Sequence, residues 1–369
     1  MITRLLSPVK KDPVLFISGL LAAATAFVIP PSPAYWEYID IRTLVLLFSL
    51  MAVVCALSRK GLLSAAADVI THRAASIRGL GVMLTLLCYF SSMLITNDVA
   101  LITFVPLALL LMRDDRRAML QTVVLQTVAA NLGSMLTPFG NPQNLYLYST
   151  YLLRPGEFFA AVLPVGLVSL LAVAALCLML PKTPLSLRFE TTGASLKADA
   201  SLYLLAGLFL LCVLAVLRLV PYPLAAVLTI AVLLITDRRA LMKVDYNLLI
   251  TFCFFFIFVG NLSRMDAVRS LLGRLLSGRE VLVSALASQF VSNVPAALML
   301  SEFTDKGKAL VTGTNIGGMG TLIASMASLI SFKLYCRTEG AQVKRYLGVF
   351  TWVNFGLLAG LLLLARVMA

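Results

Sequence analysis

The sequence NLGSMLT at residues 131–137 decides how the chain is organised, because residues 315–321 repeat it as NIGGMGT. Asn, Gly, Met and Thr coincide in the two copies, and Leu is replaced conservatively by Ile. Similar segments that recur along a chain are the signature of repeated structural units. The two copies therefore indicate that one fold occurs twice.

A second match lies upstream of the first in both halves. Asp40 and Asp245 each open an apolar segment, which leads through an amphipathic stretch into a second apolar run. A polar pair interrupts each of these runs, Thr96-Asn97 in one and Ser292-Asn293 in the other. We assign residues 12–181 to repeat 1, residues 199–219 to a linking span and residues 223–369 to repeat 2. With four crossings in each copy, the linking span inverts the second copy, as in secondary transporters.

The composition places the chain in a membrane. Hydrophobic residues make up 60% of the 369 residues and charged residues only 13%, against about 25% in soluble domains. The apolar runs have the length of single bilayer crossings, so we predict an all-α polytopic membrane protein. The net charge of +13 comes from clusters between these runs, which is a topology signal and not a sign of a nucleic-acid partner. Most Lys and Arg residues are cytoplasmic if the N-terminus is cytoplasmic and the C-terminus outside, so we expect this orientation in the cell's inner membrane.

The polar interruptions predict two re-entrant hairpins. An uninterrupted helix over residues 79–112 would be about 51 Å long, whereas the hydrocarbon core is about 30 Å thick. A hairpin with its tip at Thr96-Asn97-Asp98 resolves the mismatch, and two complete spans are the alternative. Residues 281–301 alone would suit a single span, but Ser292-Asn293-Val294-Pro295 mirrors the first tip. Pro295 fits the first turn of a new helix with Ser292 or Asn293 as its N-cap.

Two further segments are predicted to be broken helices. Within residues 117–150 we expect a helix to about Asn131 and a second helix with Asn141 as its N-cap, because Pro138 and Pro142 remove backbone hydrogen bonds. The counterpart over residues 305–335 breaks at residues 317–320. Irregular backbone at membrane depth persists only where protein or water covers it, so four converging breaks would enclose a polar chamber. Alternatively, the small residues in these segments only permit close helix packing.

Other classes of function find little support. The sequence contains no HExxH, GxSxG or phosphate-loop motif, so we expect no enzyme. The one histidine, His72, and six scattered cysteines offer no metal or cofactor site. The N-termini of half-helices favour anions, and free carbonyls with Asn, Ser or Thr oxygens can bind Na⁺. The sequence therefore favours a transporter, with Na⁺ or H⁺ as the coupling ion and no cofactor.

Four segments resemble the ion transporter superfamily, the citrate-transporter-like permeases. They are Thr96-Asn97-Asp98, residues 131–144 with their Gly-Asn-Pro, Ser292-Asn293-Val294-Pro295, and residues 315–328. The superfamily includes divalent anion–sodium symporters, arsenite efflux permeases and sodium/proton antiporters. The resemblance implies an elevator-type homodimer that moves a small anion, citrate- or dicarboxylate-like or an inorganic oxyanion, with Na⁺ or H⁺. A sodium/proton antiporter or an arsenite efflux permease is the alternative.

The resemblance also implies the site residues. The expected substrate-binding residues are Thr96, Asn97, Ser292, Asn293, Thr137, Pro138, Asn141 and Thr321. The expected Na⁺ ligands are Asn97, Asp98, Gly133, Thr137, Gly140, Asn141, Asn293, Gly317, Gly318 and Thr321. As an intramembrane carboxylate, Asp98 is a functional candidate that could bind Na⁺ or carry a proton, or it could cap the second hairpin helix.

Overall fold

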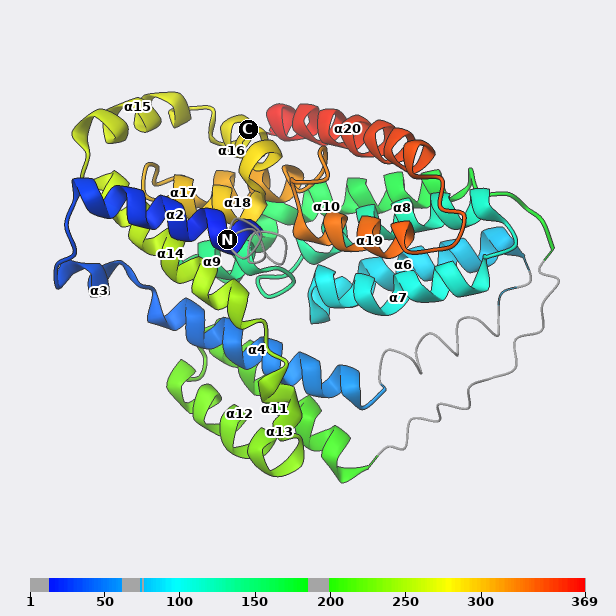
Figure 1. Cartoon of the computed structure of the whole chain (residues 1–369), viewed down its shortest axis with the longest axis horizontal. Coiled ribbons are helices and arrows are strands. Elements are labelled where there is room, and N and C mark those ends of the chain that lie inside the picture. The colour runs from blue at the N-terminus through cyan, green and yellow to red at the C-terminus, as the bar shows by residue number, and fades with distance from the viewer. Residues whose placement is uncertain (1–12, 62–73, 75, 185–198, 369) are drawn as a thin grey trace, which may run out of the picture.

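The computed structural model describes residues 13–61, 74, 76–184 and 199–368, which are helical apart from connecting loops and one isolated bridge between Ser76 and Pro184 (Figure 1). The helices of the first half are α2 (Pro13–Val28), α3 (Ala34–Tyr38), α4 (Ile41–Arg59), α6 (Ile77–Ile95), α7 (Asn97–Leu111), α8 (Arg116–Ser134), α9 (Pro142–Thr150) and α10 (Pro155–Cys177). Those of the second half are α11 (Ala200–Val216), α12 (Tyr222–Thr236), α13 (Arg238–Met242), α14 (Tyr246–Ser263), α15 (Asp266–Leu276), α16 (Glu280–Val291), α17 (Asn293–Ser301), α18 (Gly307–Ile316), α19 (Met326–Cys336) and α20 (Val343–Met368).

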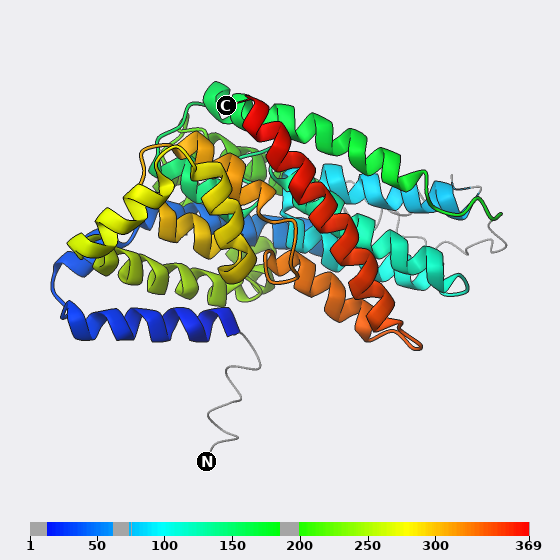
Figure 2. The same cartoon turned by 90° about the horizontal axis from the view of Figure 1, so that it is seen from above.

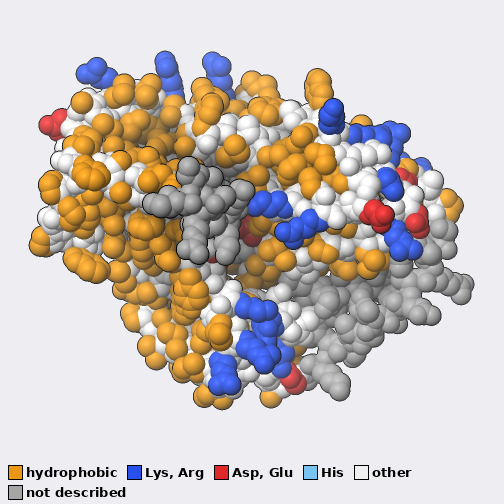
Figure 3. Space-filling model, viewed as in Figure 1, with side chains coloured by type: hydrophobic (Ala, Val, Ile, Leu, Met, Phe, Trp, Pro, Cys, Tyr) orange, Lys and Arg blue, Asp and Glu red, His pale blue; other side chains and the backbone are white. Residues whose placement is uncertain are grey.

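Long apolar helices confirm the polytopic membrane fold. Among the described residues, α4, α6, α10, α14 and α20 are each long and apolar enough to cross a bilayer, and six shorter apolar helices accompany them. Hydrophobic side chains cover most of the left-hand part of the face in Figure 3, and Lys and Arg lie along its upper edge and in its right-hand and lower parts. Asp40 and Asp245 are the N-caps of α4 and α14, because each side chain accepts a hydrogen bond from the backbone N–H three residues later.

The helices α6 and α7 form the first predicted hairpin. The chain reverses at Thr96, whose φ of 73° lies in the left-handed region, and α7 starts at the next residue. The start of α6 and the end of α7 also lie close together. A Cβ built on Gly81, near the start of α6, would lie 3.5 Å from the side chain of Met112, which directly follows α7. Two antiparallel complete spans would pair in the same way, and α6 is long enough to cross a bilayer, so the re-entrant course of this hairpin stays a prediction.

The helices α16 and α17 form the second hairpin, so residues 281–301 are not a single straight span. Ser292 has a φ of 74°, almost the same as Thr96. At the open end, the Thr304 hydroxyl contacts the Glu280 carboxylate at 3.5 Å. Pro295 falls in the first turn of α17 as predicted, but the Ser292 side chain at the N-cap makes no capping hydrogen bond.

Both broken helices are present. The first consists of α8 and α9, and Asn141 caps α9 by accepting a hydrogen bond from the Asn144 N–H at 2.9 Å. In the second, α18 ends at Ile316 and α19 starts at Met326, so the break is longer than the predicted residues 317–320. The order of hairpin, broken helix and final long helix is the same in both halves. The inversion of one copy and the elevator movement stay predictions.

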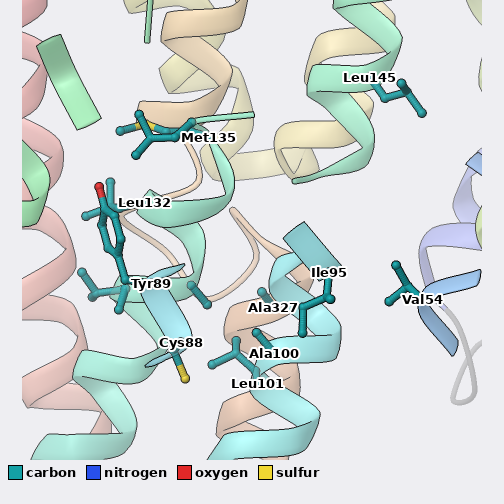
Figure 4. Packing of buried hydrophobic residues seen from close by; sticks show 14 of the residues in the cluster. Val54, Cys88, Tyr89, Ile95, Ala100, Leu101, Leu132, Met135, Leu145 and Ala327 are labelled. Atoms are coloured by element: carbon teal, nitrogen blue, oxygen red, sulfur yellow. The ribbon is translucent and has the colours of Figure 1, made fainter. Parts of the chain in front are cut away.

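The hairpins pack directly onto the broken helices. Figure 4 shows Cys88 and Tyr89 of α6 beside Leu132 and Met135 of the first broken helix, with Ala327 of α19 near the α7 residues Ala100 and Leu101. The helices α4, α11, α12 and α13 form a separate layer at the bottom of Figure 1. Seen from above in Figure 2, α10 and α20 run across the outside of the bundle.

Polar contacts sort the chain into two ends, as the predicted topology requires. At one end Lys60 pairs with Asp199 and Arg59 with Asp237. At the other, the Tyr151 hydroxyl donates to the carbonyl of Thr304, and Arg218 donates to the carbonyl of Leu153. Which end faces the cytoplasm stays a prediction, and the N-terminal tail and His72 lie outside the described residues.

Candidate functional site

The tip of the first hairpin is hydrogen-bonded to both broken helices through Asn131. The Asn97 amide donates to Asn131 Oδ1 at 3.1 Å, and the Ser325 hydroxyl donates to the same oxygen at 2.9 Å. The Asn131 amide in turn donates to Ser328 Oγ at 3.2 Å. All four side chains are buried, and Asn131 thereby joins residues from α7, α8 and α19.

The two broken helices are also bonded directly to each other. The Asn141 amide donates to Asn315 Oδ1 at 3.0 Å, and the Asn315 amide donates to Asn144 Oδ1 at 2.6 Å. A further bond of 3.2 Å runs from the Asn141 amide to Ser134 Oγ. Asn141 therefore does more than cap α9, because its side chain reaches the other half of the chain.

The tip of the second hairpin reaches the same place through the backbone. The Asn293 N–H donates to the Ala324 carbonyl at 2.9 Å, and Ala324 precedes Ser325. Asn97 and Asn293 thus lie at the two sides of one network, linked by Asn131 and Ser325. The Asn293 amide nitrogen has no hydrogen-bond acceptor among the described residues. It lies close to Gly318 of the second break, since a Cβ built on that glycine would be 3.1 Å away. This amide is free to donate to a bound solute.

We call this set the asparagine network: Asn97, Asn131, Ser134, Asn141, Asn144, Asn293, Asn315, Ser325 and Ser328. The helices α7, α9, α17 and α19 all begin at this network. The first turn of a helix has N–H groups without intrahelical partners and carries partial positive charge. Each hydrogen bond named above joins uncharged groups, so four helix ends supply the positive potential without a basic side chain.

One carboxylate lies beside the network. Asp98 is the second residue of α7, and its side chain accepts no hydrogen bond or ion pair from a described residue, so it does not cap the helix as one interpretation predicted. Asp245, the N-cap of α14, lines a cavity of about 20 Å³ together with Ser292 and Pro295 of the second tip. The tip of the second hairpin therefore faces the start of α14.

The other predicted site residues lie in the two breaks. The Thr137 hydroxyl donates to the Met93 carbonyl at 2.6 Å and ties the first break to α6. Pro138 is buried in the same break. Gly140 approaches Ser134 so closely that a Cβ would lie 2.2 Å from its carbonyl oxygen. In the second break, the Thr321 N–H donates to Gln289 Oε1 at 2.9 Å.

Gly133 and Gly317 permit close helix packing, as the alternative interpretation of the small residues in these segments predicted. A Cβ on Gly133 would lie 2.0 Å from the Tyr89 carbonyl oxygen of α6, and one on Gly317 would lie 2.8 Å from Ala285 Cα of α16. Each glycine lets the first helix of a hairpin contact a broken helix. This contact is sufficient reason for glycine at both positions, and the Na⁺ role stays a prediction.

Several residues that form or support the site were absent from the predicted set. Asn131 and Asn315 open the repeated motif, so the repeat itself was a signal for them. Gln289 gave no such signal, yet its amide donates to the carbonyls of Gly317 and Met319 at 2.9 Å each. Gln289 holds the second break in shape from the neighbouring hairpin helix.

Comparisons with known proteins agree with this architecture. A family model for a citrate transporter matches residues 4–304. An uncharacterized transporter of Methanocaldococcus jannaschii is 34% identical over 257 residues, which cover 69% of this chain and 70% of the relative. The inner membrane protein YbiR of Escherichia coli is 28% identical over 320 residues, which cover 85% of this chain and 86% of the relative.

The fold has a counterpart among solved structures. The crystal structure of the Alcanivorax borkumensis YdaH transporter matches with a TM-score of 0.59 and 15% identity, covering 88% of this chain and 84% of that chain. This likeness and the sequence matches confirm the resemblance and indicate a transport role rather than a catalytic one. The chain is a multi-pass membrane transporter and belongs to the citrate transporter family.

Proposed function

We propose that the protein is a secondary active transporter that moves a small anion with carboxylate or oxyanion groups, and that a gradient of Na⁺ or H⁺ drives it. One observation carries the proposal: the N-termini of α7, α9, α17 and α19 meet at a buried network of uncharged side chains. Such helix ends bind anions through N–H groups and partial charge. The free Asn293 amide adds a donor at the same place.

The helix C-termini support a cation next to the anion. The helices α6, α8, α16 and α18 end where the four breaks begin, and half-helix C-termini with unwound carbonyls bind Na⁺ in transporters of this general design. The predicted ligands Thr137, Asn141, Gly318 and Thr321 lie within these breaks. We further propose that hairpins and broken helices move as a transport domain against a scaffold, in a homodimer.

Uptake into proteoliposomes tests the proposal. Purified protein would be given labelled citrate, succinate or sulfate under an imposed Na⁺ or proton gradient. We expect Asn97→Ala and Asn293→Ala to reduce uptake at least about tenfold, since a hydrogen bond to a charged group contributes about 1.5–3 kcal/mol.

Asn354→Ala is the matched control. Asn354 is equally buried, but its amide donates only to the Phe350 carbonyl of its own helix, α20. This variant should retain uptake. Full uptake by Asn97→Ala or Asn293→Ala would show that the solute binds elsewhere, and Na⁺/H⁺ exchange without any anion uptake would exclude the anion hypothesis.

A sodium/proton antiporter is the second candidate, and the position of Asp98 favours it. Asp98 lies at the tip of the first hairpin as the second residue of α7, and Asp245 lines a small cavity with residues of the second tip. Intramembrane carboxylates commonly carry protons or bind ions. The same liposomes, loaded with a pH-sensitive dye, distinguish exchange from anion symport.

A further inference from the structure

Three buried polar atoms without a hydrogen-bond partner gather near the carboxyl end of α9. They are Arg42 Nε, Arg218 Nε and the Tyr148 hydroxyl. The Tyr148 side chain is only 1% exposed. Buried donors of this kind destabilise a protein unless an acceptor is supplied, so three at one place call for a ligand.

Arg218 is held rigidly over Tyr148. It follows α11 with a φ of 64°, and its two terminal nitrogens donate to the carbonyls of Leu153 at 3.2 Å and Tyr148 at 2.7 Å. Its guanidinium carbon lies 5.0 Å from the centroid of the Tyr148 ring. These contacts use one N–H of each terminal nitrogen and leave the buried Nε without a partner.

Arg42 brings a second positive charge to the same place. It lies in the first turn of α4, which packs against both α9 and α11. Its guanidinium makes no hydrogen bond or ion pair with a described residue. Burial and the charge of Arg42 lower the pKa of Arg218 from its ordinary value, and no carboxylate contributes to that shift. Both charges also act on the Tyr148 hydroxyl.

We propose that Arg42, Arg218 and Tyr148 bind one phosphate-type oxyanion, either free in solution or in the headgroup of an anionic lipid. Guanidinium groups match the geometry of phosphate oxygens, and an anion here would neutralise two adjacent cations that lack a counter-ion. Tyr148 follows Asn144 by one helical turn of α9, and none of the three residues shares a hydrogen bond with the asparagine network. The site is therefore separate from the asparagine network, and the inference does not depend on the proposed function.

Arg42→Gln is the cleanest test, because Arg42 makes no contact that holds the fold together. Arg264→Gln is its control, since the Arg264 guanidinium also lies over a tyrosine ring, but over that of Tyr38 at 5.3 Å and not over that of Tyr148. Thermal unfolding of detergent-purified protein would be measured in sodium phosphate and in sodium chloride of equal ionic strength. Native mass spectrometry would compare bound phosphatidylglycerol with phosphatidylcholine.

We expect Arg42→Gln to weaken binding at least about tenfold, which corresponds to one charge-assisted hydrogen bond, and Arg264→Gln to leave it unchanged. Tyr148→Phe keeps the ring under Arg218 and removes only the hydroxyl, so it should weaken binding without lowering the stability of the ligand-free protein. Stabilisation by phosphate identifies a free anion, whereas selective retention of phosphatidylglycerol identifies a lipid. Binding of neither probe, or equal binding by wild type and Arg42→Gln, would overturn the proposal.

Discussion

Replacing Gln289 with methionine should loosen the second break while it preserves side-chain volume. The Gln289 amide donates to the carbonyls of Gly317 and Met319, and its oxygen accepts from the Thr321 N–H. Methionine leaves these three backbone groups without a partner. If each hydrogen bond contributes about 1 kcal/mol, the free energy of unfolding falls by about 3 kcal/mol. If each contributes about 0.6 kcal/mol, as is typical within membranes, it falls by about 2 kcal/mol.

Gln126→Met provides a graded control for this prediction. Gln126 is also buried, but its amide donates to one carbonyl only, that of Phe104, and its own oxygen has no partner. Thermal unfolding in detergent should therefore show a clearly lower melting temperature for Gln289→Met than for Gln126→Met. Uptake should fall only in Gln289→Met, because its break carries Gly318 and Thr321. Equal melting temperatures for the two variants would refute the reasoning.

Three further predictions address packing, charge and coupling. Gly133→Ala should destabilise by about 1–3 kcal/mol through overpacking against α6, whereas Gly207→Ala in α11, where a Cβ meets nothing within 4 Å, should stabilise by up to about 1 kcal/mol. Thermal unfolding measures both. The hydrogen bond from Lys60 lowers the pKa of Asp199 from 3.8 to about 2, so its contribution to stability is complete above pH about 4 and is lost as the pH falls toward 2. Asp199→Asn should therefore lose less stability than wild type over that pH range. Asp98→Asn should remove the dependence of uptake on the cation gradient, and unchanged pH and Na⁺ profiles would exclude Asp98 as the coupling group.

The sequence was sufficient to predict the hairpins and broken helices, because each depends on local signals. An Asn-Pro pair such as Asn141-Pro142 favours the start of a helix through local geometry alone. The match between Ser292-Asn293 and Thr96-Asn97 identified a hairpin in a segment whose length alone would have predicted a single span. The left-handed backbone at Thr96 and Ser292 was not predictable. Non-glycine residues adopt it only where the surrounding structure stabilises it.

Contacts between distant segments explain what the sequence could not reveal. Gln289 acts on residues 317–321 only because α16 packs beside α18, and nothing in its own neighbourhood predicts that function. Arg42 and Tyr148 come from α4 and α9, and Arg218 follows α11, so the three residues lie far apart in the chain. By contrast, Asn131 and Asn315 were visible as the first residues of the repeated motif, and a prediction based on the repeat would have included both.

A structure of the protein with a bound dicarboxylate, determined by electron cryomicroscopy, would test the central claim most directly. We predict density for the anion between the N-termini of α7 and α17, within hydrogen-bonding distance of the Asn293 amide and beside Asn97. Density at another position, or a gap between the two hairpin tips that breaks the link through Asn131 and Ser325, would contradict the claim.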